Sequence, residues 1–194
     1  MYTADFIIYS ILTLIIFIEI FVFIYFIEYL ICVCIHHQPP FVSTEKSTQK
    51  AIIQEIKKHY PQATKICEIG SGYGQMARFI GRKTGAKVIA LENMPISVLI
   101  SKTLDLFQTN SKTIKCDAFE FLDTTKQKFD IGIAYLSPKY SDKLLKYKNK
   151  FKVLITIDFA ISKLPPTKTI NSGHGNTIFN GKKYPHKLFI YEFK

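Results

Sequence analysis

The chain has 194 residues, which fits one ordinary domain, and its 47% hydrophobic and 21% charged residues exclude a disordered or low-complexity protein. The net charge of +11 comes mainly from 24 lysines, with only two arginines, Arg78 and Arg82. Because recognition of bases and phosphates favours the planar arginine fork, we expect no nucleic-acid partner. Scattered lysines suit an acidic partner or an anionic lipid surface.

The first predicted element is a membrane anchor within residues 1–35. From Phe6 to Ile27, 17 of 22 residues are Phe, Ile, Leu or Val, and about 20 apolar residues suffice to cross a bilayer. Glu19 near the middle costs about 3 kcal/mol, less than these apolar residues contribute to insertion. This carboxyl either meets a polar group of a membrane partner or has no role. Because no basic segment precedes the span and no cleavage site of small residues follows it, we expect it to be retained.

The orientation of this anchor follows from the lysines. None precedes the span, whereas Lys46, Lys50, Lys57 and Lys58 follow it. The positive-inside rule then predicts a single-pass membrane protein whose soluble part faces the cytoplasm, or the mitochondrial matrix if the protein is eukaryotic.

Residues 36–60 are predicted to form a linker at the membrane and a first helix. Two prolines stiffen the linker over residues 36–43. Thr44 is the expected cap of a helix in which Ile52, Ile53 and Ile56 recur with helical spacing, and Pro61 ends it.

Residues 61–194 alternate between strand and helix patterns. Strands are predicted at 65–69, 87–92, 113–117, 129–136 and 152–158, and helices at 75–82, 95–107 and 139–148. This order predicts an α/β fold with a Rossmann-like sheet covered by helices. We expect segments 177–179 and 186–193, which flank Asn180-Gly181, to close the sheet as an antiparallel hairpin.

A glycine-rich turn follows the first of these strands. The sequence Glu68-Ile-Gly70-Ser-Gly72-Tyr-Gly74 leaves the strand and enters a helix, where open α/β sheets bind nucleotides. Glycines let a ligand approach the backbone, and the helix start offers free N–H groups. Gln75 stands where the dinucleotide fingerprint needs Gly or Ala, so a different nucleotide is expected.

Two further acids end the next two predicted strands. Glu92 is placed to accept both hydroxyls of a ribose, and Asp117 to accept from an adenine amino group. The alternative is that these acids are helix caps or loop residues.

These residues resemble the seven-β-strand methyltransferases that use S-adenosylmethionine. Together with the anchor, further stretches resemble the membrane-anchored protein-lysine methyltransferases of mitochondria, which modify the ATP synthase c subunit or the adenine nucleotide translocase. The stretches are Pro40-Phe-Val-Ser-Thr44, Gly70-Ser-Gly72-Tyr-Gly74, Glu92-Asn-Met-Pro95 and Tyr135-Leu-Ser-Pro138.

The resemblance implies a cofactor, S-adenosylmethionine, and roles for individual residues; no metal is implied. Tyr135, Ser137 and Pro138 would face the methyl acceptor, Tyr135 either by cation–π attraction or as an ordinary aromatic at a strand end. The implied cofactor-binding residues are Thr44, Glu68, Gly70, Ser71, Gly72, Tyr73, Gly74, Glu92, Asn93, Asp117 and Ala118.

We therefore expect a methyltransferase that N-methylates a lysine of a membrane protein. A small-molecule or lipid methyltransferase on the same scaffold is one alternative. The other is a non-catalytic membrane scaffold, because Tyr73 stands where the family usually has an acid. The segment 139–152, with six lysines, is expected to face the lipid bilayer or solvent.

Overall fold

The computed structural model describes residues 2–30, 34, 43–107, 110–172, 178–179, 182–183 and 185–193. The chain forms two compact units, residues 1–40 and residues 41–194, and each is described by itself. Apart from Ser43, the predicted linker lies outside the described residues.

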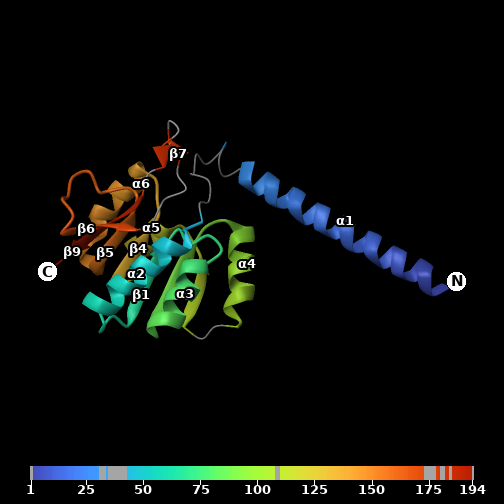
Figure 1. Ribbon diagram of the computed structural model, residues 1–194, viewed down its shortest axis with the longest axis horizontal. Coiled ribbons are helices and arrows are strands. Elements are labelled where there is room, and N and C mark those ends of the chain that lie inside the picture. Colours follow the sequence, from blue (N-terminus) through green and yellow to red (C-terminus); the bar gives the residue numbers. More distant parts are fainter. Residues whose placement is uncertain are drawn as a thin grey trace. The chain divides into compact units, whose positions relative to one another are not determined.

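The first unit is built on one helix, α1 (Tyr2–Leu30), of 29 residues (Figure 1). Its segment Asp5–Ile27 is long and apolar enough to cross a membrane. Large apolar side chains along it are exposed, among them Phe17 at 67% and Phe23 at 63%. These are the length and composition expected of the predicted anchor.

The second unit is organised around a seven-stranded sheet with the order β3-β2-β1-β4-β5-β9-β6. The five strands from β3 to β5 are parallel, and β9 is antiparallel to both of its neighbours. The strands are β1 (Lys65–Ile69), β2 (Lys87–Glu92), β3 (Ser111–Lys115), β4 (Phe129–Ala134), β5 (Phe151–Ile157), β6 (Lys168–Ser172) and β9 (His186–Glu192). The predicted α/β Rossmann-like class is confirmed.

Helices cover both faces of this sheet, which explains why its central strands are apolar on both sides. Figure 1 shows α2 (Lys46–His59), α3 (Gln75–Thr84) and α4 (Pro95–Asp105) side by side. Ile52 and Ile80 from the first two of these helices pack with Ile66 of β1 in one core cluster. The opposite face is covered by α5 (Ala118–Thr124) and by the 3₁₀ helix η2 (Leu144–Lys150), which continues from α6 (Pro138–Lys143).

The antiparallel closure of the sheet is confirmed, but its strands differ from those expected. β9 pairs with β5 and with β6, not with segment 177–179. Within that segment, β7 (Ile178–Phe179) pairs with β8 (Lys182–Lys183) instead. β6 escaped prediction because it is an edge strand whose residues are mostly exposed and polar, so its sequence has no apolar alternation.

The strand order places one edge of the sheet as the expected ligand site. Sequence order reverses at β1, which lies between β2 and β4. In open α/β sheets a ligand binds beyond the carboxyl ends of the strands at such a reversal. The turn between β1 and α3 lies at this point.

Candidate active site

The turn between β1 and α3 has the backbone conformation that its glycines predict. Gly70, Gly72 and Gly74 all have positive φ, at 72°, 53° and 66°. The N–H groups of Gly70 and Ser71 both donate to the carbonyl of Leu91 at 3.0 Å. The turn is therefore held against the end of β2, with its backbone close to the carboxyl edge of the sheet.

Close packing leaves little space for a side chain at two of these glycines, and least at Gly74. A Cβ atom at Gly70 would lie 3.0 Å from Cδ2 of Leu136, and one at Gly74 only 2.2 Å from Oγ of Ser101. Gly74 thus lets α3 begin directly against α4. Because L-residues with side chains are also strained at positive φ, the turn tolerates substitution poorly.

Glu92 lies where the sequence predicts, at the end of β2 and beside the turn. Its Oε2 accepts the N–H of Gly72 at 2.6 Å. Its Oε1 accepts the N–H groups of Asn93 at 2.7 Å and Met94 at 2.9 Å. The structure therefore brings Glu92, Asn93 and the glycine turn together, with the carboxylate held by backbone donors.

Glu68 is the most perturbed acid of the site. Its side chain is buried, and Oε2 has no hydrogen-bond partner among the described residues. Burial raises the pKa of Glu68 to about 8, and the nearby Glu92 adds to the rise, whereas the Ala77 N–H and Arg78 oppose it. A buried carboxyl oxygen without a partner is costly, so this atom is suited to receive a donor from a ligand.

A small pocket of about 20 Å³ adjoins Glu68. It brings together the acid, the glycine turn and the end of β4, which the sequence separates by more than 60 residues. Ser71, whose Oγ is also buried without a partner among the described residues, lies on its wall. The pocket is lined by Ser43, Thr44, Gln49, Glu68, Gly70, Ser71, Gln75, Met76, Ile133, Tyr135 and Ile157.

The backbone carbonyls of Thr44 and Tyr73 accept side-chain hydrogen bonds near the glycine turn. The predicted capping role of Thr44 is wrong, because Glu45 is the residue that precedes α2 and has no capping side-chain bond. The carbonyl of Thr44 instead accepts Nε2 of Gln49 at 2.8 Å. The carbonyl of Tyr73 accepts Nη2 of Arg78 at 2.6 Å, which fixes the second half of the turn.

Asp117 occupies a strand end but also caps a helix. Its Oδ1 accepts the N–H groups of Phe119 at 2.8 Å and Glu120 at 3.1 Å, and α5 begins at Ala118. This is the cap considered as the alternative from the sequence, and it ends β3 two residues earlier than predicted. The role of Asp117 and Ala118 toward adenine stays a prediction.

Of the three residues predicted to face the acceptor, Tyr135 alone is among those lining the pocket. Its hydroxyl donates to Oδ2 of Asp158 at 2.7 Å. Burial raises the pKa of Tyr135, and the bond to Asp158 raises it further. Ser137 and Pro138 begin α6, where the Ser137 carbonyl accepts the N–H of Ser141 at 2.9 Å.

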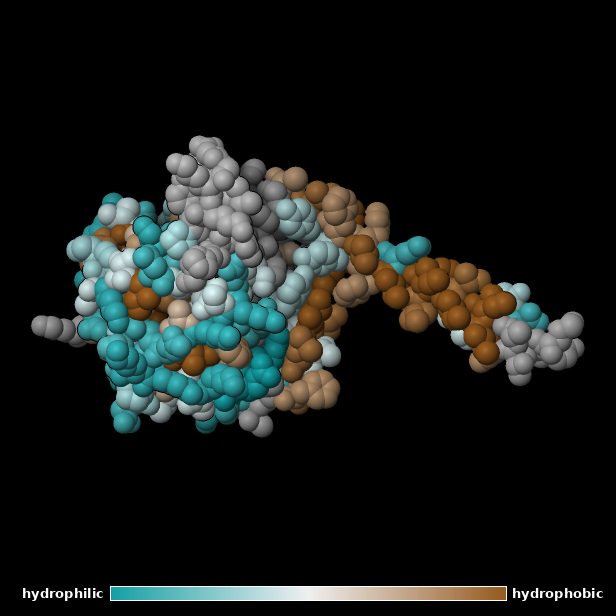
Figure 2. Space-filling view, in the orientation of Figure 1, coloured by the Kyte–Doolittle hydropathy of each residue, from teal (hydrophilic) through white to brown (hydrophobic). Residues whose placement is uncertain are grey.

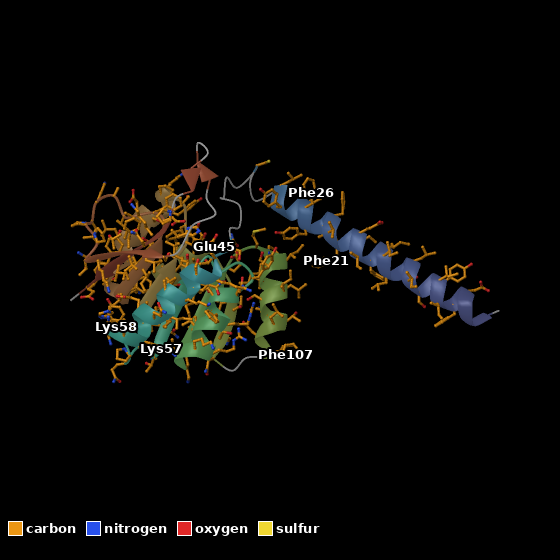
Figure 3. All side chains as sticks on the ribbon, viewed as in Figure 1. Phe21, Phe26, Glu45, Lys57, Lys58 and Phe107 are labelled. Carbon is orange, nitrogen blue, oxygen red and sulfur yellow. The ribbon has the colours of Figure 1, made fainter. Side chains whose placement is uncertain are left out.

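Asp158 and His186 complete this side of the site and were missed from the sequence. Asp158 follows β5 with φ of 62°, and its Oδ2 lies 2.7 Å from Nδ1 of the buried His186. Glu45, labelled in Figure 3, approaches the other ring nitrogen at 3.8 Å. Asp158 directly follows the parallel strand β5, just as Glu92 stands at the end of β2. This position at the carboxyl end of a parallel strand was the sequence feature that could have identified Asp158 as a site residue.

The comparisons with known proteins support the fold. No protein-family model matches the chain, and no curated protein matches it either.

Solved structures do match. An RNA methyltransferase from Salinibacter ruber in complex with S-adenosyl-L-homocysteine is 17% identical, with a TM-score of 0.62, covering 78% of this chain and 93% of that chain. The precorrin-6y C5,15-methyltransferase from Geobacter metallireducens GS-15 is 11% identical, with a TM-score of 0.59, covering 81% and 93%. A putative O-methyltransferase from Klebsiella pneumoniae is 11% identical, with a TM-score of 0.58, covering 80% and 84%. The chain thus has the Rossmann-like fold of S-adenosylmethionine-dependent methyltransferases.

Proposed function

We propose that this protein is an S-adenosylmethionine-dependent methyltransferase that N-methylates a lysine side chain of a membrane protein. The observation that carries the proposal is the pair of acids at the glycine turn. Glu92 is held against the Gly72 N–H, and Glu68 keeps a buried oxygen without a partner among the described residues. Both the fold and these two acids support S-adenosylmethionine as the ligand of this site.

The residues present fit this cofactor. The Oε2 of Glu68, buried without a partner among the described residues, is suited to accept from the ammonium group of the cofactor. Glu92 with Asn93 would hold the ribose, and Asp117 with Ala118 the adenine. When bound, S-adenosylmethionine supplies a methyl group made electrophilic by its sulfonium.

The residues around Tyr135 fit a nitrogen acceptor. Because the Tyr135 hydroxyl donates a hydrogen bond to Asp158, the lone pairs of its oxygen can accept a hydrogen bond from an N–H group. The carboxylates of Asp158 and Glu45 favour the approach of a cationic side chain. A lysine has a pKa of about 10.4 in water and must become neutral to attack, which burial beside the pocket favours.

The apolar helix α1 favours an acceptor in the same membrane. A tether raises the effective concentration of substrates that share its bilayer, without any additional contact. The span Asp5–Ile27 is suited to that role by length and composition. We therefore infer that the protein is a single-pass membrane protein. By the positive-inside rule, its methyltransferase unit lies on the side of the lysines that follow the span, which is the cytoplasm or the mitochondrial matrix.

The test uses the full chain in nanodiscs with S-adenosylmethionine labelled in its methyl group, mixed with membranes from cells that lack the chain. Label in a membrane protein, recovered as methyllysine after hydrolysis, supports the proposal. Label confined to the organic extract overturns the lysine acceptor in favour of a lipid. Failure of the chain to bind the cofactor in calorimetry overturns the enzyme altogether and leaves a scaffold.

A further inference from the structure

Helix α4 buries two serines together with the apolar Ile96 and Val98, and it also exposes large apolar side chains. Ser97 and Ser101 are fully buried. The exposed side of a surface helix in a soluble domain is ordinarily polar. Four large apolar side chains on α4 and the turn after it, which we name the α4 face, are exposed: Leu99 at 59%, Leu104 at 42%, Leu106 at 81% and Phe107 at 81%.

Hydrogen bonds fix α4 in this orientation. The Oγ of Ser101 lies 2.6 Å from Oγ1 of Thr113 in β3. Asp105, the only acid of α4, accepts both the N–H and the hydroxyl of Thr113 at 2.7 Å. Arg78, which lies on α3, contacts the same carboxylate, with Nη1 3.4 Å from Oδ1 of Asp105. Turning the α4 face inward would break this buried network, so the apolar side chains must point away from the sheet.

The surroundings of the α4 face are basic. Lys102 is exposed on α4 itself, and Lys115 is exposed on β3, the strand that α4 contacts most. Figure 2 shows hydrophobic residues along the edge of the globular unit that α4 forms, and Figure 3 marks Phe107 at the end of the helix. An apolar surface bordered by lysines has the chemistry that binds the interface of an anionic bilayer.

We propose that the α4 face is a second membrane contact, inserted into the interface of the bilayer that α1 spans. This inference rests on the proposed membrane anchoring. The chain between Leu30 and Ser43 has twelve residues and extends at most about 40 Å, so it keeps the globular unit near the lipid. The same tether makes lipid the most available apolar phase for Leu106 and Phe107.

The protein contains no tryptophan, so one introduced tryptophan reports a single position. The experiment uses the full chain in nanodiscs of phosphatidylcholine and phosphatidylglycerol, with or without brominated acyl chains that quench tryptophan on contact. Phe107→Trp is the test variant. Phe21→Trp in α1 is the positive control. Thr169→Trp is the negative control, because Thr169 is exposed on β6, at the opposite edge of the sheet from β3.

We expect bromine to reduce the emission of Phe107→Trp by about half, as for a side chain buried 5–10 Å into the interface. Thr169→Trp should stay unquenched. Adding Lys102→Glu to Phe107→Trp should restore much of the emission in anionic nanodiscs. These results would support the α4 face as a lipid contact.

Other outcomes overturn the inference in distinguishable ways. If Phe21→Trp is quenched while Phe107→Trp behaves like Thr169→Trp, the anchor stands and the α4 face does not bind lipid. A blue-shifted Phe107→Trp emission without bromine quenching means that a protein, or a second copy of the chain, covers the face instead. If Phe21→Trp is itself unquenched, the anchoring fails and the inference fails with it.

Discussion

The carboxylate of Glu92 accepts the backbone N–H of Gly72 at 2.6 Å. This bond joins the end of β2 to the middle of the glycine turn across 20 residues of sequence. The acid proposed to hold the ribose therefore also shapes the turn proposed to hold the methionine end. Substitution of Glu92 tests the cofactor site at its centre.

We expect Glu92→Ala to weaken the binding of S-adenosyl-L-homocysteine by about 5- to 150-fold, because a buried donor loses a charged acceptor worth about 1–3 kcal/mol. Calorimetric titration of the full chain in nanodiscs measures it. Glu120→Ala is the matched control, since that acid is exposed in the first turn of α5. Equal affinities for the two variants would refute the role of Glu92.

The second prediction concerns pH and Glu68. Burial raises its pKa from 4.5 to about 8, so between these values the folded protein holds a proton that the unfolded chain releases. The contribution of Glu68 to the free energy of unfolding is therefore complete below pH 4.5 and is lost as pH rises to about 8.

Glu68→Gln mimics the protonated form and lacks this loss. We expect its free energy of unfolding, measured by urea and circular dichroism between pH 5 and 8, to rise relative to the unsubstituted protein as pH increases. A difference that stays constant across the range would show that Glu68 is already ionised in the folded state.

The third prediction compares alanine substitutions at Gly74 and Gly85, the glycines before and after α3. The comparison distinguishes the cost of backbone strain from the cost of steric crowding. Both have positive φ, but a Cβ at Gly85 meets nothing within 4 Å, whereas one at Gly74 lies 2.2 Å from Oγ of Ser101. We expect Gly85→Ala to cost about 1–2 kcal/mol from strain and Gly74→Ala about 2–5 kcal/mol from strain and overpacking. Urea unfolding of both variants measures the costs, and similar values would contradict the close contact.

Tyr135 gives the fourth prediction. Tyr135→Phe removes the phenol that Asp158 orients, and we expect methyl transfer to fall by about tenfold or more while cofactor affinity changes less than about twofold. Transfer of labelled methyl to membrane protein measures the first effect, and calorimetry the second. Tyr147→Phe is the matched control, because it also breaks a tyrosine–aspartate bond, to Asp123 at 3.1 Å. Equal activities of the two variants would exclude Tyr135 from the site.

Local patterns were sufficient to predict much of the fold. β1 and β2 begin and end where the sequence indicates, because both are short apolar runs bounded by turn residues. The position of Glu92 followed from the same logic, since parallel strands end at one edge. Glu68 and the glycines could be placed for that reason as well.

Contacts between distant side chains could not be predicted in this way. Asp158 and His186 meet only because β9 returns beside β5. Arg78 and Asp105 meet because α3 and α4 are neighbours, and nothing in either helix sequence indicates that its charge is buried. Such pairs depend on tertiary packing, which one sequence does not record.

The orientation of α4 has a practical consequence for handling this protein. Removing residues 1–42 takes away the hydrophobic span, yet Leu106 and Phe107 remain in contact with water on the shortened chain. We expect that fragment to self-associate on concentration for crystallisation. Replacing those two side chains with serine should yield a monodisperse sample, since neither contributes to the core.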